Sequence, residues 1–302
     1  MKILVLGAGG TGGYFGGLLA RSGKQVVFVA RGDHLMTIRK SGLLVKNVLG
    51  DFKIYPAKVT DNPEEVETPD LVLCCVKNYD LEKILVEFKN RFGPNTTVIT
   101  TENGIDHFEI AGKILGKERV LPGGIYVFSK IESPGVILQS GGLRKIIFGE
   151  IDNSKSARVR KISEAFSKAK INFEVPTDIL VPIWEKFIFI CGLGGLTAYN
   201  KSSIGEILEN KKLARLLEGV VNEGISIAKK INVRLLPNTF QKLMDLLHKS
   251  DPNSKSSLLF DIERGKQNEL EYLNGKLVKL GNKLGIPTPA NLEIYRKVKN
   301  YE

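Results

Sequence analysis

The sequence predicts an α/β protein in which a doubly wound sheet is followed by an all-α domain. Short apolar strand patterns alternate with amphipathic helical patterns up to about residue 176, and only helical patterns follow. The first strand pattern runs directly into a glycine-rich loop that opens a helix. A chain of 302 residues typically forms two domains, so we expect one at residues 1–177 and a helical one at residues 178–302.

The first element is a βαβ unit of about thirty residues. Lys2–Leu6 is a short apolar run with β preference, and it precedes the loop Gly7-Ala-Gly-Gly-Thr-Gly12. An apolar helical pattern follows as far as Ser22, and Gln25–Ala30 forms the second strand. A G-x-G-x-x-G loop between two such strands is the fingerprint of a dinucleotide-binding Rossmann domain.

Each glycine of this fingerprint has a physical task in holding a pyrophosphate. Gly7 permits the tight turn, Gly9 lets the backbone approach the phosphates, and Gly12 lets the helix pack closely on the sheet. The helix N-terminus adds unpaired N–H groups and the positive end of its dipole. The alternative is a glycine-rich turn without a ligand. We expect the cofactor to contact the whole loop, namely Gly7, Ala8, Gly9, Gly10, Thr11 and Gly12.

The residue after the second strand indicates which nicotinamide nucleotide binds. NAD-selective sites usually place Asp or Glu there to hold the ribose 2′-hydroxyl, whereas an Arg pairs with a 2′-phosphate. Arg31 stands at this position, directly after the strand, which favours NADP(H). Asp33 lies two residues further on, so a shifted register would restore an acidic residue. A solvated loop cation is the remaining alternative for Arg31.

Lys77 and Asn103 follow the carboxyl ends of two further predicted strands, Asp70–Val76 and Thr96–Thr101. The first of these runs is almost continuously apolar, as expected of a parallel strand covered on both faces. In open α/β sheets, ligands bind beyond the carboxyl ends of the strands. We therefore expect Lys77 to neutralise phosphate or substrate charge, and Asn103 to hydrogen-bond the nicotinamide or a substrate oxygen. The alternative for each is a helix-capping or loop residue.

The remaining patterns extend the sheet and then build the helical domain. Residues 42–59 predict a hairpin, residues 120–150 predict further strands, and residues 171–175 predict a last strand after a helix at 155–170. The helices expected beyond it are 178–198, 203–209, 211–231, 237–249, 256–265, 269–284 and 289–300.

The helix at residues 178–198 is apolar enough to raise the question of a membrane span. Glu185 and Lys186 lie near its middle, where charge is expensive in lipid, so we expect a buried helix and no membrane partner. The first apolar run of the chain ends in the glycine loop and does not predict a signal peptide.

The composition limits the other classes of site and partner. The net charge of +11 is spread over the chain, without the dense basic stripe expected of a nucleic-acid-binding protein. Three cysteines, of which Cys74 and Cys75 are adjacent, cannot form a disulfide framework and indicate a reducing, cytoplasmic setting. His34, His107 and His248 lie far apart, so we expect each at the surface or in a loop, and no metal site.

The chain resembles the ketopantoate reductase (2-dehydropantoate 2-reductase) family along nearly its whole length. The resemblance implies reduction of ketopantoate to pantoate with NADPH, a step of pantothenate biosynthesis. It also implies a site in the cleft between a Rossmann domain and a helical substrate domain. Besides the glycine loop and Arg31, the blocks that carry it are Val76-Lys77, Glu102–Ile105, Ile183–Phe187, Leu196–Ala198, Lys255–Leu258, Asn268–Gly275 and Gly285–Pro289.

The resemblance implies roles for four side chains. The lysine that matches Lys186 is the general acid on the carbonyl oxygen, and the glutamate that matches Glu269 holds a substrate hydroxyl; these are the expected catalytic residues. Ser257 and Asn103 match residues that help to bind the substrate. The residue types suit the chemistry, because arriving hydride turns the carbonyl oxygen into an alkoxide that a proton-donating cation stabilises. The alternative for Lys186 is a helix-end or interface salt bridge, but its apolar neighbours Trp184, Phe187, Ile188 and Phe189 argue for a special role. Taken alone, Glu269 would be part of a solvated helix face.

Two positions depart from the family pattern. Asparagines four and eight residues after the lysine are replaced by Ile190 and Gly194, which share the helix face of Lys186. Three hypotheses therefore remain: a ketopantoate reductase, a paralogue that reduces another 2-oxo acid with an apolar group against Ile190, and an NADP(H)-binding sensor without turnover. A homodimer is a possible assembly.

Overall fold

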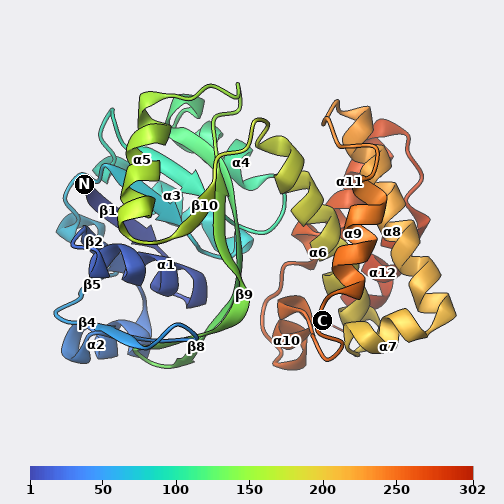
Figure 1. Cartoon of the computed structure of the whole chain (residues 1–302), viewed down its shortest axis with the longest axis horizontal. Helices are drawn as coiled ribbons and strands as arrows, with labels where there is room; N and C mark the ends of the chain where they lie inside the picture. The colour runs from blue at the N-terminus through green and yellow to red at the C-terminus, as the bar shows by residue number, and fades with distance from the viewer. Residues whose placement is uncertain (302) are drawn as a thin grey trace. The chain divides into compact units, whose positions relative to one another are not determined.

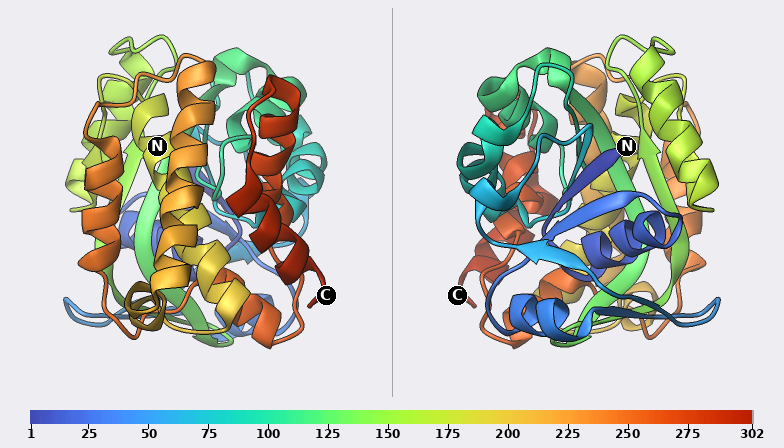
Figure 2. Two further views of the ribbon diagram at one scale, coloured as in Figure 1. Left: turned by 90° about the vertical axis from the view of Figure 1, so that its right-hand side faces the viewer. Right: turned by 90° about the vertical axis from the view of Figure 1, so that its left-hand side faces the viewer.

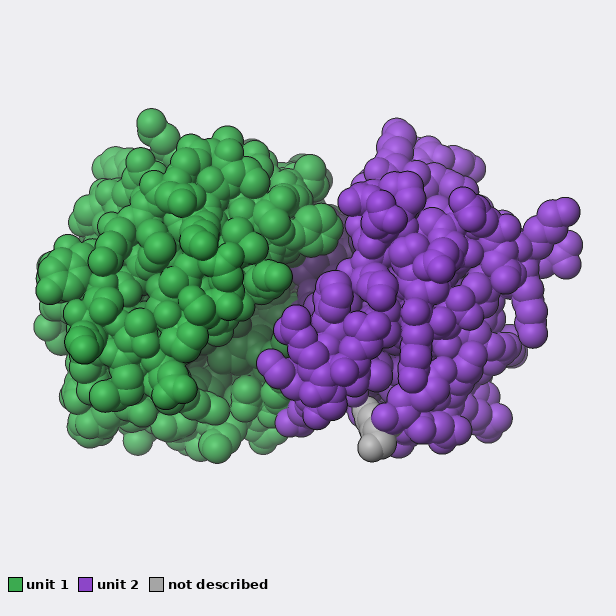
Figure 3. All heavy atoms as spheres, turned by 90° about the horizontal axis from the view of Figure 1, so that it is seen from below, with its two compact units in different colours: residues 1–102, 106–179 green, residues 103–105, 180–302 purple. Residues whose placement is uncertain are grey.

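The computed structural model describes residues 1–301, which form two compact units (Figure 1, Figure 3). The first unit consists of Met1–Glu102 and Asp106–Ile179, and the second consists of Asn103–Ile105 and the chain from Leu180 onward. The sequence does not predict that Asn103–Ile105 belongs to the second unit. This short segment follows a strand of the first unit but belongs by its contacts to the second.

Ten strands of the described chain form one mixed sheet in the first unit, in the order β4-β3-β9-β8-β7-β6-β1-β2-β5, with β10 paired to β9. The strands are β1 (Lys2–Leu6), β2 (Gln25–Val29), β3 (Leu43–Asn47), β4 (Phe52–Ile54), β5 (Lys58–Thr60), β6 (Leu71–Cys74), β7 (Thr97–Thr100), β8 (Val120–Ser133), β9 (Val136–Phe148) and β10 (Asn172–Glu174).

The order of the strands reverses at β1, which pairs in parallel with β2 on one side and with β6 on the other. Strands β7 and β8 continue the parallel pairing beyond β6. Ile3 and Val5 of β1 belong to one hydrophobic core, whereas Leu4 and Leu6 belong to another. Both faces of β1 are therefore covered, which explains its uninterrupted apolar sequence. The predicted α/β class, a doubly wound sheet with a helical C-terminal part, is confirmed.

Helices cover the two faces of this sheet (Figure 1, Figure 2). Residues of α1, α2 and α5 join the core of Ile3, whereas residues of α3 and α4 join the core of Leu4. Helices α2 and α4 are additional to the elements expected from the sequence. The helices are α1 (Gly10–Arg21), α2 (Gly32–Ser41), α3 (Asn78–Phe88), α4 (His107–Leu115) and α5 (Ala157–Lys168), with 3₁₀ turns η1 (Pro63–Glu65), η2 (Lys89–Arg91) and η3 (Lys117–Arg119).

A long antiparallel hairpin, β8–β9, extends the sheet beyond β7, so the strands expected at residues 120–150 are confirmed. Strand β3 pairs in parallel with β9 and carries β4 in antiparallel pairing. The hairpin expected at residues 42–59 is correct for β3 and β4 but wrong for β5, which lies at the opposite edge beside β2. Strand pairing between distant segments decides this placement, and no local pattern encodes it.

The second unit is helical. Its helices are α6 (Leu180–Asn200), α7 (Ile204–Glu209), α8 (Lys211–Lys230), α9 (Thr239–His248), α10 (Ser257–Glu263), α11 (Asn274–Leu284) and α12 (Pro289–Lys299), with a 3₁₀ turn η4 (Leu270–Tyr272).

The single helix expected at residues 269–284 is wrong, because Leu273 interrupts it with φ −107° and ψ −105°. The interruption accompanies an inward-facing Asn274. The buried amide of Asn274 donates to the Cys191 carbonyl oxygen at 3.2 Å and to Asn291 Oδ1 at 2.9 Å. Glu269 consequently precedes a 3₁₀ turn and does not lie on a long helix.

Helix α6 is the central helix of the second unit and contacts α8, α10 and α12. By length and composition it could cross a membrane, with mean hydropathy 1.4, yet 61% of that apolar window is buried inside the protein. A Cβ at Gly192 would lie 2.9 Å from Leu217 Cδ1, and one at Gly195 would lie 2.6 Å from Asn274 Oδ1. Small residues thus bring neighbouring segments close to α6, as expected of a core helix.

The expected surface position holds for one histidine, His248, which is exposed at the end of α9. His107 is only 1% exposed, and its Nδ1 lies 2.8 Å from Thr100 Oγ1, so a hydrogen-bond partner permits its burial. His34 is half-buried against the glycine loop. Among residues 1–301 no cluster of His, Cys, Asp and Glu is suited to a metal ion.

Candidate active site

The glycine loop joins β1 to α1 through a backbone that excludes side chains at both ends. Gly7 has a φ of +91°, and a Cβ there would lie 2.9 Å from Val76 Cγ1. A Cβ at Gly12 would lie 2.1 Å from the Gly7 carbonyl oxygen. Only glycine meets both requirements, because it adopts positive φ freely and permits close packing of the helix on the sheet.

The two adjacent glycines in the middle of the loop, Gly9 and Gly10, have different surroundings. A Cβ at Gly10 would lie 2.5 Å from the Ser129 carbonyl oxygen of β8, so the sheet itself requires glycine there. At Gly9 no atom lies within 4 Å of the Cβ position. Gly9 is also the N-cap of α1 and supplies no side-chain cap to the first turn. An uncapped helix N-terminus beside an open stretch of backbone fits the pyrophosphate of a dinucleotide.

Arg31 lies just beyond the carboxyl end of β2, at the N-cap of α2. Its side chain is 54% exposed, and Nη1 lies 3.9 Å from Asp80 Oδ1. A pair so long and exposed is weak, so the guanidinium can exchange this partner for a phosphate. Asp33 is also exposed, in the first turn of α2. The structure therefore places both the predicted residue and its acidic alternative after β2.

Lys77 follows β6 at the carboxyl ends of the parallel strands, where β1 and β2 also end. It is the half-buried N-cap residue of α3, and its side chain does not cap the helix. A cation at a helix N-terminus is opposed by the helix dipole. Charge neutralisation of a ligand by Lys77 stays a prediction.

In the second unit, Lys186 and Asn103 are in direct contact. The Lys186 ammonium of α6 donates a hydrogen bond of 3.1 Å to Asn103 Oδ1. The two residues are separated by 83 positions, and the exchanged segment Asn103–Ile105 brings them together. A charge-assisted hydrogen bond restrains the direction in which the ammonium points.

The residue before Lys186 makes an ion pair between two helices. Glu185 is 7% exposed, and its Oε2 accepts a hydrogen bond of 2.5 Å from Lys242 Nζ on α9. Because successive residues of a helix project about 100° apart, Glu185 and Lys186 serve different surroundings. The bond between α6 and α9 therefore does not use Lys186.

Glu269 is only 4% exposed, so the alternative of a solvated helix face is wrong. Ser257 is exposed in the first turn of α10, whereas the neighbouring Ser256 is buried. Ser256 Oγ accepts a hydrogen bond from the Leu259 N–H and lies 2.6 Å from Thr197 Oγ1. Ser256 is thus a capping residue that joins α10 to α6, and Ser257 remains accessible for a ligand.

The two positions that depart from the family pattern lie in apolar surroundings. A Cβ added at Gly194 would lie 3.8 Å from Ile190 Cγ2, and 3.9 Å from both Leu258 Cδ2 and Leu273 Cδ1. These are ordinary van der Waals distances, so the position has room for a small side chain. The segments that carry Ser257 and Glu269 therefore meet the face of α6 that carries Ile190. We call Ile190, Gly194, Leu258 and Leu273 the apolar wall.

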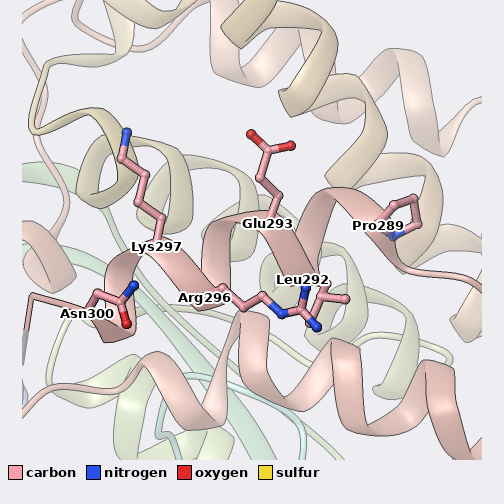
Figure 4. A pocket seen from close by; sticks show the side chains of 6 residues that line it. All are labelled: Pro289, Leu292, Glu293, Arg296, Lys297 and Asn300. Carbon is pink, nitrogen blue, oxygen red and sulfur yellow. The ribbon is translucent and has the colours of Figure 1, made fainter.

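Two open pockets of the second unit lie away from these residues. One has a volume of about 500 Å³, and Figure 4 shows that its lining comes from α12 and the residue after it. The other has a volume of about 440 Å³ and includes Asn268, which precedes Glu269, and Tyr272, which precedes Leu273. None of the predicted site residues lines either pocket.

One residue in contact with the glycine loop is not predicted from the sequence. His34 Nε2 lies 2.8 Å from the Ala8 carbonyl oxygen, in the middle of the loop. The other ring nitrogen, Nδ1, accepts a hydrogen bond of 3.0 Å from the N–H of Gly135. The available signal is weak: a histidine three residues after Arg31, in the segment that follows the second strand of a nucleotide-binding fingerprint.

Comparison with protein-family models matches most of the chain. A model described as "Ketopantoate reductase PanE/ApbA" matches residues 3–153, and one described as "Ketopantoate reductase PanE/ApbA C terminal" matches residues 178–302.

Individual proteins are similar to this chain over its full length. The uncharacterized oxidoreductase YkpB of Bacillus subtilis is 28% identical over 302 residues, with coverage of 100% of this chain and 99% of the relative. A 2-dehydropantoate 2-reductase of Pyrococcus horikoshii is 29% identical over 303 residues, with coverage of 100% and 98%.

Solved structures are also similar to this chain over its full length. A PanE/ApbA family ketopantoate reductase from Ralstonia eutropha JMP134 is similar with a TM-score of 0.93 and 26% identity, over 100% of this chain and 98% of the other. A D-mandelate dehydrogenase bound to NADH and anilino(oxo)acetate has a TM-score of 0.90 at 22% identity, over 100% and 98% of the two chains. At that identity the second likeness shows a shared fold.

Proposed function

Since the chain belongs to the ketopantoate reductase family, we propose that it reduces the keto group of a 2-oxo acid with NADPH as hydride donor. Family membership makes the chain an oxidoreductase; the nucleotide preference, the substrate and the residue roles are the proposed parts. The observation that carries the proposal is the Lys186 ammonium of helix α6, which donates a hydrogen bond to the Asn103 amide oxygen.

We assign nucleotide binding to residues 1–177 and substrate binding to residues 178–302 together with Asn103. The loop Gly7–Gly12 would hold the pyrophosphate, Arg31 the 2′-phosphate, and Lys77 would neutralise phosphate charge. The preference for NADPH rests on Arg31, with Asp33 as the competing residue that would favour NADH. A bound nicotinamide nucleotide supplies the hydride.

Lys186 acts as the general acid in the proposed reaction. As the substrate C2 gains hydride, the carbonyl π pair moves to its oxygen, and the Lys186 ammonium gives that oxygen a proton. The product is a 2-hydroxy acid, and the neutral amine regains its proton from water. Asn103 Oδ1 orients the ammonium, and the Ser257 hydroxyl and Glu269 carboxylate orient the substrate.

Ketopantoate is the first substrate to test, because the family and relatives such as the Pyrococcus horikoshii protein carry its name. The apolar wall favours a second candidate, a different 2-oxo acid with an apolar side chain. A hydroxylated substrate would find no hydrogen-bonding side chain at Ile190 or Gly194. Losing one such bond costs about 0.5–1.5 kcal/mol. An apolar side chain would instead gain by burial against Ile190.

The test is turnover of purified protein with NADPH and a panel of 2-oxo acids, followed through the absorbance of the reduced nicotinamide. Oxidation with ketopantoate at the highest kcat/KM supports pantoate formation in a cytoplasmic pantothenate pathway. Highest kcat/KM with a branched apolar 2-oxo acid supports the second candidate. Tight NADPH binding without oxidation by any member of the panel would overturn both and identify a nucleotide sensor.

A further inference from the structure

His34 links three segments of the first unit that are distant in sequence. It is the third residue of α2, and its ring contacts the glycine loop at Ala8 and the β8–β9 turn at Gly135. The separations are 26 and 101 residues, so these contacts exist only in the folded unit.

The hydrogen bonds define the tautomer of the ring. The Gly135 N–H can only donate, so His34 Nδ1 must present its lone pair. The single ring proton of the neutral imidazole is then on Nε2, where it is donated to the Ala8 carbonyl oxygen at 2.8 Å. Burial lowers the pKa of His34 below 6.5, against the opposing effect of the hydrogen bond to Ala8, which agrees with a neutral ring.

The ring acts on a loop peptide that the proposed function assigns to the pyrophosphate. The Ala8 N–H is already held by the Val29 carbonyl oxygen at 2.8 Å, at the end of β2. His34 holds the carbonyl oxygen of the same residue. In a planar trans peptide, the Ala8 C=O and the Gly9 N–H point in opposite directions. Holding the carbonyl therefore also directs the Gly9 N–H, at the loop position whose Cβ site is open.

The β8–β9 hairpin supports this arrangement at a second point. The Cβ position of Gly10 is 2.5 Å from the Ser129 carbonyl oxygen, so the start of α1 lies directly against β8. The loop is thus held by contact at Gly10 and, through the imidazole, by the turn at Gly135. Both supports come from the same hairpin.

We propose that neutral His34 is a positioning residue of the nucleotide site, which holds the Ala8–Gly9 peptide in the orientation that binds the pyrophosphate. The inference rests on the proposed nucleotide binding and deepens it. His34 needs no contact with the nucleotide, since it acts through the backbone of Ala8.

Three variants test this role. His34→Leu removes both hydrogen bonds, whereas His34→Gln keeps an N–H donor and an oxygen acceptor on one flexible side chain. His248→Leu is the matched control, because it removes an exposed histidine of the second unit. The measurements are the Kd of NADPH by calorimetry, the Tm of the nucleotide-free protein, and the imidazole ¹⁵N chemical shifts of the wild-type protein.

We expect His34→Leu to raise the Kd of NADPH about tenfold, as for the loss of one hydrogen bond. We expect His34→Gln to restore most of the affinity, and His248→Leu to leave it unchanged. The ¹⁵N shifts should show a neutral His34 protonated on Nε2.

Wild-type affinity in a folded His34→Leu variant overturns this inference while leaving the proposed function intact. Equal loss of affinity in His34→Leu and His34→Gln, in proportion to a fall in Tm, also overturns it, because the ring would then only fill space. If the wild-type protein binds neither NADPH nor NADH, the proposed function fails and the inference fails with it.

Discussion

Two neighbouring glycines of α6, Gly194 and Gly195, should respond in opposite ways to alanine. At Gly194 the new methyl group would meet Ile190 Cγ2 at 3.8 Å and two leucine methyl carbons at 3.9 Å, which are favourable contacts. At Gly195 it would lie 2.6 Å from Asn274 Oδ1. That amide cannot retreat freely, since its nitrogen donates to the Cys191 carbonyl oxygen and to Asn291 Oδ1.

The magnitudes follow from these distances. Replacing a mid-helix glycine by alanine stabilises by about 0.5–1 kcal/mol through backbone entropy. Burying one more methyl group adds up to about 0.8 kcal/mol. Gly194→Ala should therefore stabilise by about 1 kcal/mol. Gly195→Ala gains the same backbone term, but overpacking and a displaced buried amide outweigh it, for a net loss of about 2 kcal/mol. The two variants should differ by about 3 kcal/mol.

Thermal and denaturant unfolding of both variants, without nucleotide, measures this difference. NADPH affinity serves as the control, since neither glycine lies in the nucleotide loop. If the apolar wall receives the substrate side chain, Gly194→Ala should also raise KM for the bulkiest accepted 2-oxo acid more than for the smallest. A Gly194→Ala variant destabilised as strongly as Gly195→Ala would show that the space at Gly194 is not as the structure describes it.

Three further predictions concern single charged residues. Lys186→Ala should lower kcat about 10²–10⁴-fold while leaving the Kd of NADPH unchanged, and near-normal turnover would remove Lys186 as the general acid. Arg31→Ala should raise the Kd of NADPH about ten- to a hundredfold and that of NADH little, because only NADPH loses a charge-assisted hydrogen bond; an unchanged ratio would place Arg31 outside the site. Glu271 is half-buried, which raises its pKa, but donors on Lys299, Tyr295 and Lys279 outweigh burial and lower the pKa from 4.5 to about 2. The unfolded chain therefore takes up this proton first as pH falls, so the stabilisation is complete above pH 4.5 and is lost towards about pH 2. Glu271→Gln should accordingly lower Tm at neutral pH by an amount that vanishes near pH 2, and a constant difference across this range would refute the ion pairs as its cause.

The parts of the fold that the sequence predicts are those with local causes. Gly7 needs positive φ, and Gly12 must admit the helix to the sheet, so both leave a recognisable spacing in the chain. The alternating cores on the two faces of β1 likewise require a continuous apolar run. Such requirements leave a pattern within a few residues of sequence, and the corresponding fold predictions are correct.

The parts that the sequence does not predict depend on distant partners. Strand β5 follows β4 closely in the chain but pairs with β2 at the other edge of the sheet. The break at Leu273 accompanies the bond of Asn274 to a carbonyl 83 residues away. The His34 ring accepts a hydrogen bond from the N–H of Gly135, which is 101 residues away in the chain. In each case the local pattern permits several outcomes, and tertiary hydrogen bonds choose one.

Two pairs of adjacent residues show the same limit at the candidate site. In the pair Glu185-Lys186, the glutamate ties α6 to α9 through Lys242, whereas the lysine donates a hydrogen bond to Asn103. In the pair Ser256-Ser257, the first serine caps α10 and meets Thr197, which leaves the second exposed. The sequence identifies each pair but does not show which of the two residues makes the structural contact. A shift of one position along a helix turns a side chain by about 100°, so adjacent residues face different neighbours. The fold makes the division: Glu185 and Ser256 anchor their helices, and the proposed function assigns the chemistry to Lys186 and Ser257.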